Sequence, residues 1–210
     1  MPWQNRVTPD GDLLAVPDRG TLTGNRGVLH DAHGRIVRRS QNRRWIACLL
    51  DFRGRTRIVM TPGRWTNLFF LDEATALAAG HRPCAECRRP DYVEFRRCWT
   101  AGLDLSALPG ADDLDDVLHR ERALVDGRRT TWSAPGRDLP DGAMVHLDGA
   151  PWLVADGRVH RWSHSGYSDR TTLPGGRLDV LTPASVVATL RAGYRAGLHP
   201  TAGASPRTAT

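Results

Sequence analysis

The segment from Leu68 to Pro90 reads LFFLDEATALAAGHRPCAECRRP and contains the clearest structural signals of the chain. It begins with a short apolar run typical of a buried strand, followed by an alanine-rich segment that Asp72 can cap as a helix and that a glycine ends. The pair Cys84 and Cys87 comes next, between two prolines that favour a tight loop. Because two thiols at this spacing can bind one soft metal ion, the stretch predicts a strand, a helix and half of a zinc site.

Outward from this stretch, the sequence alternates strand and helix patterns. Turn residues predict two N-terminal hairpins, one around residues 31–34 and one formed by the β-rich runs 45–50 and 55–60. Further along we expect helices from residues 91 and 112, strands at 143–147, 151–155 and 158–162, and a helix after residue 183. The fold class is therefore α+β: a small N-terminal part with a zinc knuckle, hairpins and short helices, then a β-rich C-terminal part closed by a helix.

Charge divides the chain of 210 residues into two halves. Residues 1–100 hold 17 arginines and 10 acidic residues, a net charge of +7, whereas residues 101–210 hold 12 arginines and 13 acidic residues, a net charge of −1. We expect a basic zinc-binding region at residues 1–100, an α+β region of unknown role at 101–200 and a flexible tail at 201–210. The sequence has no secretion or membrane-spanning signal, so we expect a cytoplasmic protein without a membrane partner and with reduced cysteines.

The basic residues are all arginines, because the sequence contains no lysine. Between residues 35 and 64, nine arginines accompany one acidic residue, Asp51. Guanidinium groups pair with phosphate oxygens in a bidentate manner, so this segment predicts a nucleic-acid partner, most simply DNA; a solvated charged surface is the alternative. The candidate contacts to nucleic acid are Arg38, Arg39, Arg43, Arg44, Arg53, Arg55, Arg57 and Arg64.

Residues 44–92 resemble the Ada-type zinc module, the DNA methylphosphotriester acceptor domain. The likeness rests on the pair Phe69-Phe70, the alanine-rich helix ending in glycine, and the Arg-Pro-Cys-x-x-Cys motif that ends at Cys87. Upstream, the run Trp-Ile-Ala-Cys48 is similar in position to the strand that supplies the first cysteine of that family. The resemblance implies that Cys48, Cys84 and Cys87 hold zinc and that Cys48 also accepts the methyl group.

The fourth zinc ligand is where the sequence departs from that family. The family has Cys-x-x-x-Cys in its first pair, but Phe52 stands four residues after Cys48. His81 has the spacing His-x-x-Cys-x-x-Cys, His30 can arrive from the first hairpin, and a water molecule would make the site catalytic in type. Cys98 lies about 10 Å along the next helix at 1.5 Å per residue, so we expect it to have a structural role.

Three functions are compatible with these features. The first is a zinc-containing protein that interacts with nucleic acid, with DNA repair or modification by alkyl transfer to Cys48 as its enzymatic form. The second is a non-enzymatic DNA- or RNA-binding module with a purely structural zinc. The third is a metal-dependent nuclease that uses Asp116, His119 and Glu121 of one expected helix, although an acidic, solvated helix start explains these residues more simply.

Overall fold

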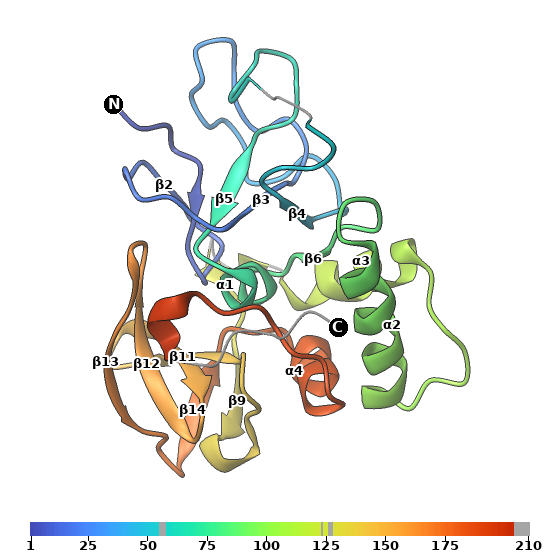
Figure 1. Cartoon of the computed structure of the whole chain (residues 1–210), viewed down its shortest axis with the longest axis vertical. Coiled ribbons are helices and arrows are strands. Elements are labelled where there is room, and N and C mark those ends of the chain that lie inside the picture. The colour runs from blue at the N-terminus through green and yellow to red at the C-terminus, as the bar shows by residue number, and fades with distance from the viewer. Residues whose placement is uncertain (55–57, 123, 126–127, 204–210) are drawn as a thin grey trace.

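A short, fully buried helix, α1 (Glu73–Ala78), lies between the two large sheets of the molecule (Figure 1). The structure, a computed structural model, describes residues 1–54, 58–122, 124–125 and 128–203. Asp72 caps α1 as expected, because its carboxylate accepts a hydrogen bond from the Thr75 backbone nitrogen at 2.9 Å. Gly80 then ends the helical path with a φ of +83°, a conformation that glycine adopts without strain.

The N-terminal sheet has six strands in the order β2-β1-β5-β3-β4-β6. Its strands are β1 (Arg6–Val7), β2 (Leu13–Leu14), β3 (Leu22–Asn25), β4 (Ile46–Leu49), β5 (Leu68–Phe70) and β6 (Arg82–Pro83). The apolar run at the start of residues 68–90 forms β5, as expected, and it pairs antiparallel with β3. At the opposite edge, β4 pairs antiparallel with β3 and parallel with β6.

The two expected N-terminal hairpins have different outcomes. The turn at residues 31–34 forms, and His30 and Ile36 make an isolated bridge across it. The second expectation is wrong in its pairing, because both edges of β4 are occupied by β3 and β6. Residues 58–60 belong to no strand, while residues 55–57 lie outside the described part of the chain. β4 therefore pairs with β6 instead of the nearby run 55–60 that the sequence pattern had indicated.

The C-terminal sheet has the strand order β13-β12-β11-β10-β14-β9. Its strands are β9 (Trp132–Pro135), β10 (Met144–Leu147), β11 (Ala150–Ala155), β12 (Arg158–Ser163), β13 (Gly166–Thr172) and β14 (Arg177–Val180). Two Asp-Gly turns, at 148–149 and 156–157, have positive φ at both residues, which matches the twist of tight hairpins. The three strands expected in this region are thus confirmed, and a small pair, β7 (Leu124–Val125) and β8 (Arg128–Arg129), precedes the sheet.

Three longer helices complete the fold on one side of α1 (Figure 1): α2 (Arg89–Gly102), α3 (Ala111–Glu121) and α4 (Ala184–Arg191). Two short 3-10 turns are present at Gly136–Asp138 and Pro200–Ala202. One apolar core joins α1 and the helices to the C-terminal sheet, and it includes Phe95 and Trp99 of α2 and Val187 of α4. Cys98 is buried in this core, as expected. The α+β class, with a β-rich C-terminal part and a final helix, is confirmed. No helix in the described ranges is long and apolar enough to cross a membrane.

Candidate metal centre

Three cysteines converge where the N-terminal sheet meets α2. Cys48 lies on β4, Cys84 follows β6 directly, and Cys87 precedes α2. Their Sγ atoms all lie within 4.8 Å of one another. The parallel pairing of β4 and β6 brings them together, because the Cys84 backbone nitrogen donates to the Ala47 carbonyl at 2.9 Å, next to Cys48. The site is thus built from one strand and one loop that are 36 residues apart in sequence, counting from position 48 to position 84.

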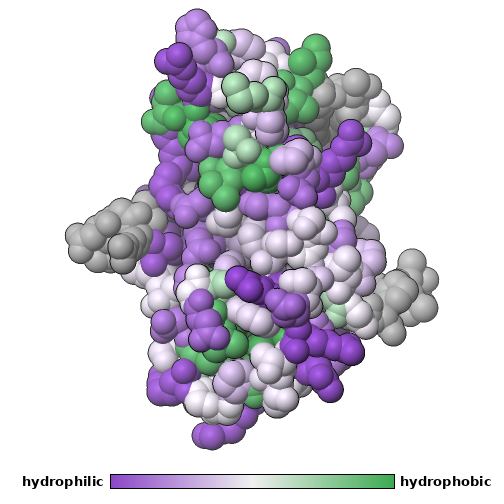
Figure 2. All heavy atoms as spheres, turned by 90° about the vertical axis from the view of Figure 1, so that its left-hand side faces the viewer, coloured by the Kyte–Doolittle hydropathy of each residue, from purple (hydrophilic) through white to green (hydrophobic). Residues whose placement is uncertain are grey.

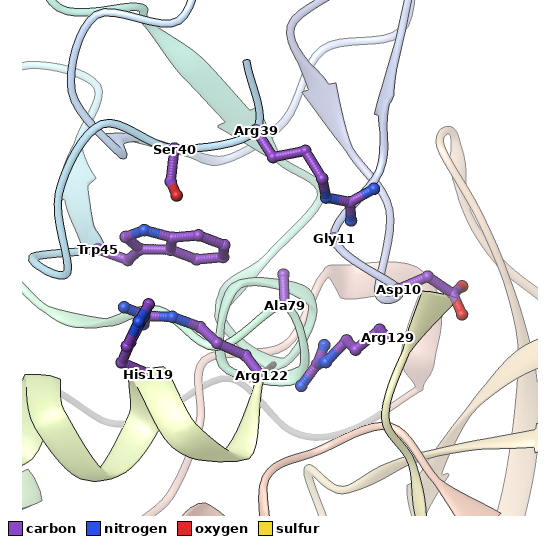
Figure 3. Close-up of a pocket in the computed structure, with 9 residues that line it drawn as sticks. All are labelled: Asp10, Gly11, Arg39, Ser40, Trp45, Ala79, His119, Arg122 and Arg129. Atoms are coloured by element: carbon purple, nitrogen blue, oxygen red, sulfur yellow. The ribbon is translucent and has the colours of Figure 1, made fainter. Parts of the chain in front are cut away.

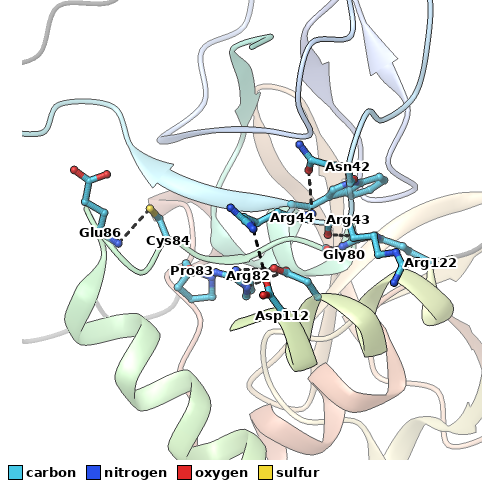
Figure 4. A network of polar contacts seen from close by, with 12 residues as sticks. Asn42, Arg43, Arg44, Gly80, Arg82, Pro83, Cys84, Glu86, Asp112 and Arg122 are labelled. Atoms are coloured by element: carbon cyan, nitrogen blue, oxygen red, sulfur yellow. Dashed lines mark hydrogen bonds and ion pairs between the residues drawn. The ribbon is translucent and has the colours of Figure 1, made fainter. Parts of the chain in front are cut away.

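The Cys84–Cys87 loop turns backbone N–H groups toward sulfur. The Glu86 backbone nitrogen donates to Cys84 Sγ at 3.4 Å (Figure 4). A hydrogen bond from the backbone N–H of Cys87 lowers the pKa of the Cys84 thiol, and one from the backbone N–H of Leu49 lowers that of the Cys87 thiol. Such donors stabilise a negatively charged sulfur, so the loop is prepared to hold thiolates.

The three thiols do not ionise independently. Hydrogen bonds from Cys48 and Cys87 lower the pKa of the Cys84 thiol to about 2. The hydrogen bond to Cys84, with that to Cys87 and burial, raises the pKa of Cys48. At Cys87 the hydrogen bond with Cys48 lowers the pKa, but the bond to Cys84 and burial leave it raised. The three thiols therefore titrate as one coupled group, and a bound cation would favour the thiolate form of all three.

The geometry of the sulfurs fits a soft metal ion. Tetrahedral zinc at a Zn–S distance of 2.3 Å places neighbouring sulfurs about 3.8 Å apart, which is compatible with three Sγ atoms grouped within 4.8 Å. Thiolates select soft or borderline ions over magnesium and calcium. Cys48, Cys84 and Cys87 can therefore hold a metal ion.

Neither histidine candidate for the fourth ligand joins this cluster. The His81 ring is fully buried between Trp45, at a centroid distance of 5.1 Å, and Phe70, at 4.6 Å, and its Nε2 accepts from Arg26 Nε. The His30 ring bonds Thr66 Oγ1 at 2.6 Å and the carbonyl of residue 61 at 3.2 Å. Within the described ranges, no further cysteine, histidine or carboxylate belongs to the group.

The acidic helix candidates are separated by their partners. Asp116 forms an ion pair with Arg43 at 2.8 Å. Glu121 points to the start of α4, where it accepts from the Ser185 backbone nitrogen at 3.1 Å. His119 instead lines a cavity beside Arg122 (Figure 3). Among the described residues these three side chains form no metal-binding group.

The arginines expected to contact nucleic acid fall into two sets. Arg39, Arg43 and Arg44 face carboxylates at 2.8, 2.8 and 3.7 Å; the Arg44 pair with Asp112 is drawn in Figure 4. The second set consists of Arg38, Arg53 and Arg64, which are exposed on the loops around β4, as Arg43 and Arg44 of the first set also are. Arg55 and Arg57 lie outside the described residues.

Sequence reasoning missed a second group of arginines. Arg26 and Arg122 are 96 residues apart in the sequence, yet the guanidinium carbon of each lies 4.0 Å from the ring centroid of Trp45. Arg129 lines the same cavity as Arg122 and Trp45. No spacing motif links these positions, so only the tertiary structure identifies the group.

No protein-family model, no curated protein and no solved structure matches this chain. The likeness of residues 44–92 to the Ada-type module therefore stays a prediction. The interpretation of the metal centre rests on its own geometry: three sulfurs in one cluster, backbone donors around them, and exposed arginines on neighbouring loops.

Proposed function

We propose that the protein is a zinc-containing nucleic-acid-binding protein. Cys48, Cys84 and Cys87 hold the zinc, and exposed arginines on the adjacent loops bind phosphates. The observation that carries the proposal is the grouping of three Sγ atoms within 4.8 Å beside a segment with nine arginines and one acidic residue.

Zinc at this position would have a structural effect on the N-terminal sheet. β6 has only two residues, and the loop between it and α2 contains the Cys-x-x-Cys pair. A metal ion bound by Cys48 on β4 and by both loop cysteines would cross-link the sheet to the start of α2. Cys48 and Cys84 are buried, which suits a structural centre.

The loops around β4 have the properties of a contact surface for a polyanion. Arg38, Arg53 and Arg64 are exposed, and exposed apolar residues such as Leu50 and Ile58 lie on the same loops. Figure 2 shows hydrophobic groups set among hydrophilic ones on the upper, N-terminal part of the visible face. Arginine supplies affinity for phosphates in any sequence context, so we expect binding that tolerates many sequences and weakens steeply with salt.

Metal analysis tests the zinc centre. Protein purified without chelator should contain one zinc per chain, and Cys84→Ser or Cys87→Ser should remove the metal and lower the melting temperature. Cys98→Ala is the matched control, because Cys98 is buried in the core outside the cluster and its replacement should leave the zinc content unchanged. Absence of stoichiometric metal from the unaltered protein would refute the proposal.

Salt-dependent binding tests the contact surface. A triple change of Arg38, Arg53 and Arg64 to Gln should reduce the slope of log affinity against log salt by about 0.9 for each lost phosphate contact on duplex DNA. The matched control changes three exposed arginines of the C-terminal sheet to Gln: Arg158, Arg170 and Arg177. Equal slopes for the two triple variants would contradict this surface, and no binding at low salt would refute nucleic-acid binding altogether.

The resemblance extends the proposal to alkyl acceptance at Cys48. In that reaction the Cys48 sulfur forms a bond to the methyl carbon of a phosphotriester, the carbon–oxygen bond breaks, and a phosphodiester anion leaves. The thioether does not regenerate, so the reaction occurs once per chain. Cys48 is only 3% exposed, which favours the non-enzymatic role. Intact-mass analysis after incubation with methylphosphotriester DNA decides between them: one added methyl on Cys48 supports transfer, and an unchanged mass of the zinc-loaded protein contradicts it.

A further inference from the structure

A cavity of about 290 Å³ opens at the C-terminal end of α1, apart from the cysteines (Figure 3). Arg39, Arg122 and Arg129 reach it from three different segments: the loop before β4, the end of α3, and β8. Trp45 forms another part of its wall. The volume is near the lower end of the range of about 300 to 1,000 Å³ found for small-molecule sites.

A fourth arginine, Arg26, lies behind this wall and is 0% exposed. Its guanidinium carbon lies 4.0 Å from the ring centroid of Trp45, and its Nη1 donates to the Gly11 carbonyl at 2.9 Å. Gly11 lines the cavity, and a Cβ built on it would lie 3.6 Å from Arg26 Nη2 and 3.9 Å from Arg39 Nη2. The missing side chain of Gly11 thus leaves space close to two guanidinium groups.

The arginines of this group keep unused hydrogen-bond donors. Arg26 Nη2, Arg122 Nε and Arg129 Nε are buried and have no hydrogen-bond partner among the described residues. Buried donors are nearly always satisfied in folded proteins, and each unsatisfied one near a charge is costly. Arg26 and Arg122 both lie against Trp45, and Arg129 lines the same cavity as Trp45, so one acceptor that binds from solution can serve this group.

The charges around the cavity are unbalanced. Four guanidinium groups, from Arg26, Arg39, Arg122 and Arg129, accompany the carboxylates of Asp10 and Asp12, which leaves two positive charges. Both carboxylates are already engaged, Asp10 with His146 at 2.9 Å and Asp12 with Arg39 at 2.8 Å. No described carboxylate forms an ion pair with Arg26, Arg122 or Arg129.

Burial also changes the pKa of the Arg122 and Arg129 guanidinium groups. Burial lowers the pKa of Arg122 to about 9 and that of Arg129 to about 10. The negative charges of Asp115 and Asp10 oppose this effect, and neighbouring arginines add to it. Two further carboxylates act on these groups from outside the cavity: Asp115, which pairs with Arg82 at 2.7 Å, and Glu121, which accepts hydrogen bonds from Ser185. A bound dianion would reverse this penalty, because it supplies the missing negative charge and the missing acceptors together.

We propose that this cavity binds a phosphate monoester, carried either by a free nucleotide or by the end of a nucleic-acid strand. A phosphate monoester has a charge of about −1.5 to −2 at pH 7 and three acceptor oxygens, which match two surplus positive charges and three free donors. Arginine forks fit this group in a bidentate manner. The site does not depend on the zinc centre or on the exposed arginines, and it goes beyond backbone binding.

Calorimetric titration at constant ionic strength tests the proposal. The probes are inorganic phosphate, adenosine 5′-monophosphate, and one short single strand with either a 5′-phosphate or a 5′-hydroxyl. Tighter binding of the monophosphate than of either strand identifies a free ester as the ligand. Tighter binding of the 5′-phosphorylated strand than of both the monophosphate and the 5′-hydroxyl strand identifies a strand end.

Two variants locate the binding. Arg39→Gln, on a half-buried residue whose only ion pair is with Asp12 among the described residues, should weaken binding of the preferred probe at least about tenfold. Arg129→Gln should do the same, with thermal melting used to confirm that it folds. Arg158→Gln, on an exposed residue of the C-terminal sheet, is the matched control and should bind normally.

Two results would overturn the site. One is no binding of any phosphorylated probe beyond that of the 5′-hydroxyl strand; the other is unchanged affinity in both folded arginine variants. Either result leaves the proposed function intact, because that proposal is tested by metal content and by the salt dependence of duplex binding with Arg38, Arg53 and Arg64.

Discussion

The two ends of α1 differ in how their buried charged groups are paired. At the N-terminal end, all four carboxylate oxygens of Asp72 and Glu73 accept hydrogen bonds. The donors are Thr75 N and Oγ1, Tyr167 OH and His199 N for Asp72, and Arg88 Nη2, Tyr194 OH and Gly197 N for Glu73. At the C-terminal end, Arg129 donates to the Ala78 carbonyl and Arg122 to the Gly80 carbonyl, but each keeps a buried nitrogen without a partner in the described part of the chain.

This difference separates a structural polar network from a binding site. The N-terminal carboxylates tie α1 to segments more than 90 residues away, such as Tyr167 and Tyr194, and Arg88 is the counter-ion of Glu73. One nitrogen of Arg88, Nη1, is also buried without a partner among the described residues, so the two ends differ in the pairing of their charges. The C-terminal arginines satisfy carbonyls yet retain donors and charge. A network whose charges are paired stabilises the fold, whereas buried arginines without a carboxylate partner can gain one from a ligand.

The largest effect should come from removing the buried ion pair at the N-terminal end of α1. Glu73→Gln removes the buried charge that pairs with Arg88 at 2.7 Å, where both side chains are almost fully buried. Arg88 then keeps Asp91, at 2.8 Å, as its remaining carboxylate partner. We expect a loss of about 3 kcal/mol in the free energy of unfolding, measured with urea. Glu94→Gln, in an exposed pair with Arg97, is the control and should leave the midpoint unchanged. Equal stability of the two variants would contradict the assignment of a structural network.

A smaller loss should follow from removing one donor to the same carboxylates. Tyr194→Phe deletes the hydroxyl that donates to Glu73, and Tyr167→Phe deletes the one that donates to Asp72. Hydrogen bonds to charged groups contribute about 1.5 to 3 kcal/mol, so each change should cost about 2 kcal/mol in urea unfolding. Values near zero for both would show that the hydroxyls are dispensable.

Near the C-terminal end of α1, removal of a buried charge should cost much less free energy of unfolding. Arg26→Met replaces a buried, unpaired charge by an apolar side chain of similar length. Removal of the uncompensated charge is favourable, whereas loss of the donors to His81 Nε2 and to the Gly11 carbonyl is not. These effects oppose one another, so in phosphate-free buffer we expect a change in the free energy of unfolding of no more than about 1 kcal/mol. A loss as large as that of Glu73→Gln would mean that Arg26 is a structural residue, and it would remove the contrast between the two ends of α1.

The smallest effect concerns the loop that carries Asp10 to the cavity. The hydrogen bond from His146 to Asp10, with a contribution from Asp179, raises the pKa of His146 against the opposing effect of burial. The stabilisation is therefore fully present below about pH 6.5, the pKa of an unfolded histidine, and is lost as pH rises through the higher folded pKa. The melting temperature should fall more between about pH 6 and pH 9 in the unaltered protein than in His146→Gln. Parallel curves would refute the linkage.

Local sequence signals predicted the secondary structure in and next to residues 68–90. The apolar run gave β5, Asp72 and Gly80 bounded α1, and the apolar face of α2 placed Tyr92, Phe95 and Trp99 in the core. These elements follow from contacts between residues close in sequence, which spacing and capping preferences report. The pairing of β4 failed for the same reason, because its actual neighbour β6 lies more than 30 residues away in the chain and leaves no local pattern.

By itself, the sequence determined which residues can act as soft metal ligands and which elements form, since thiol chemistry and helix caps are local properties. The family resemblance suggested Cys48 as a partner of Cys84 and Cys87, but the grouping of the three Sγ atoms depends on the tertiary pairing of β4 with β6. The burial of His81 against Trp45 and Phe70, away from the cysteines, is visible only in the tertiary structure. The tertiary structure alone also gathered Arg26, Arg122 and Arg129 around one cavity. Whether a charged side chain is solvated, paired or left with free donors depends on the segments that pack around it, and these come from distant parts of the chain.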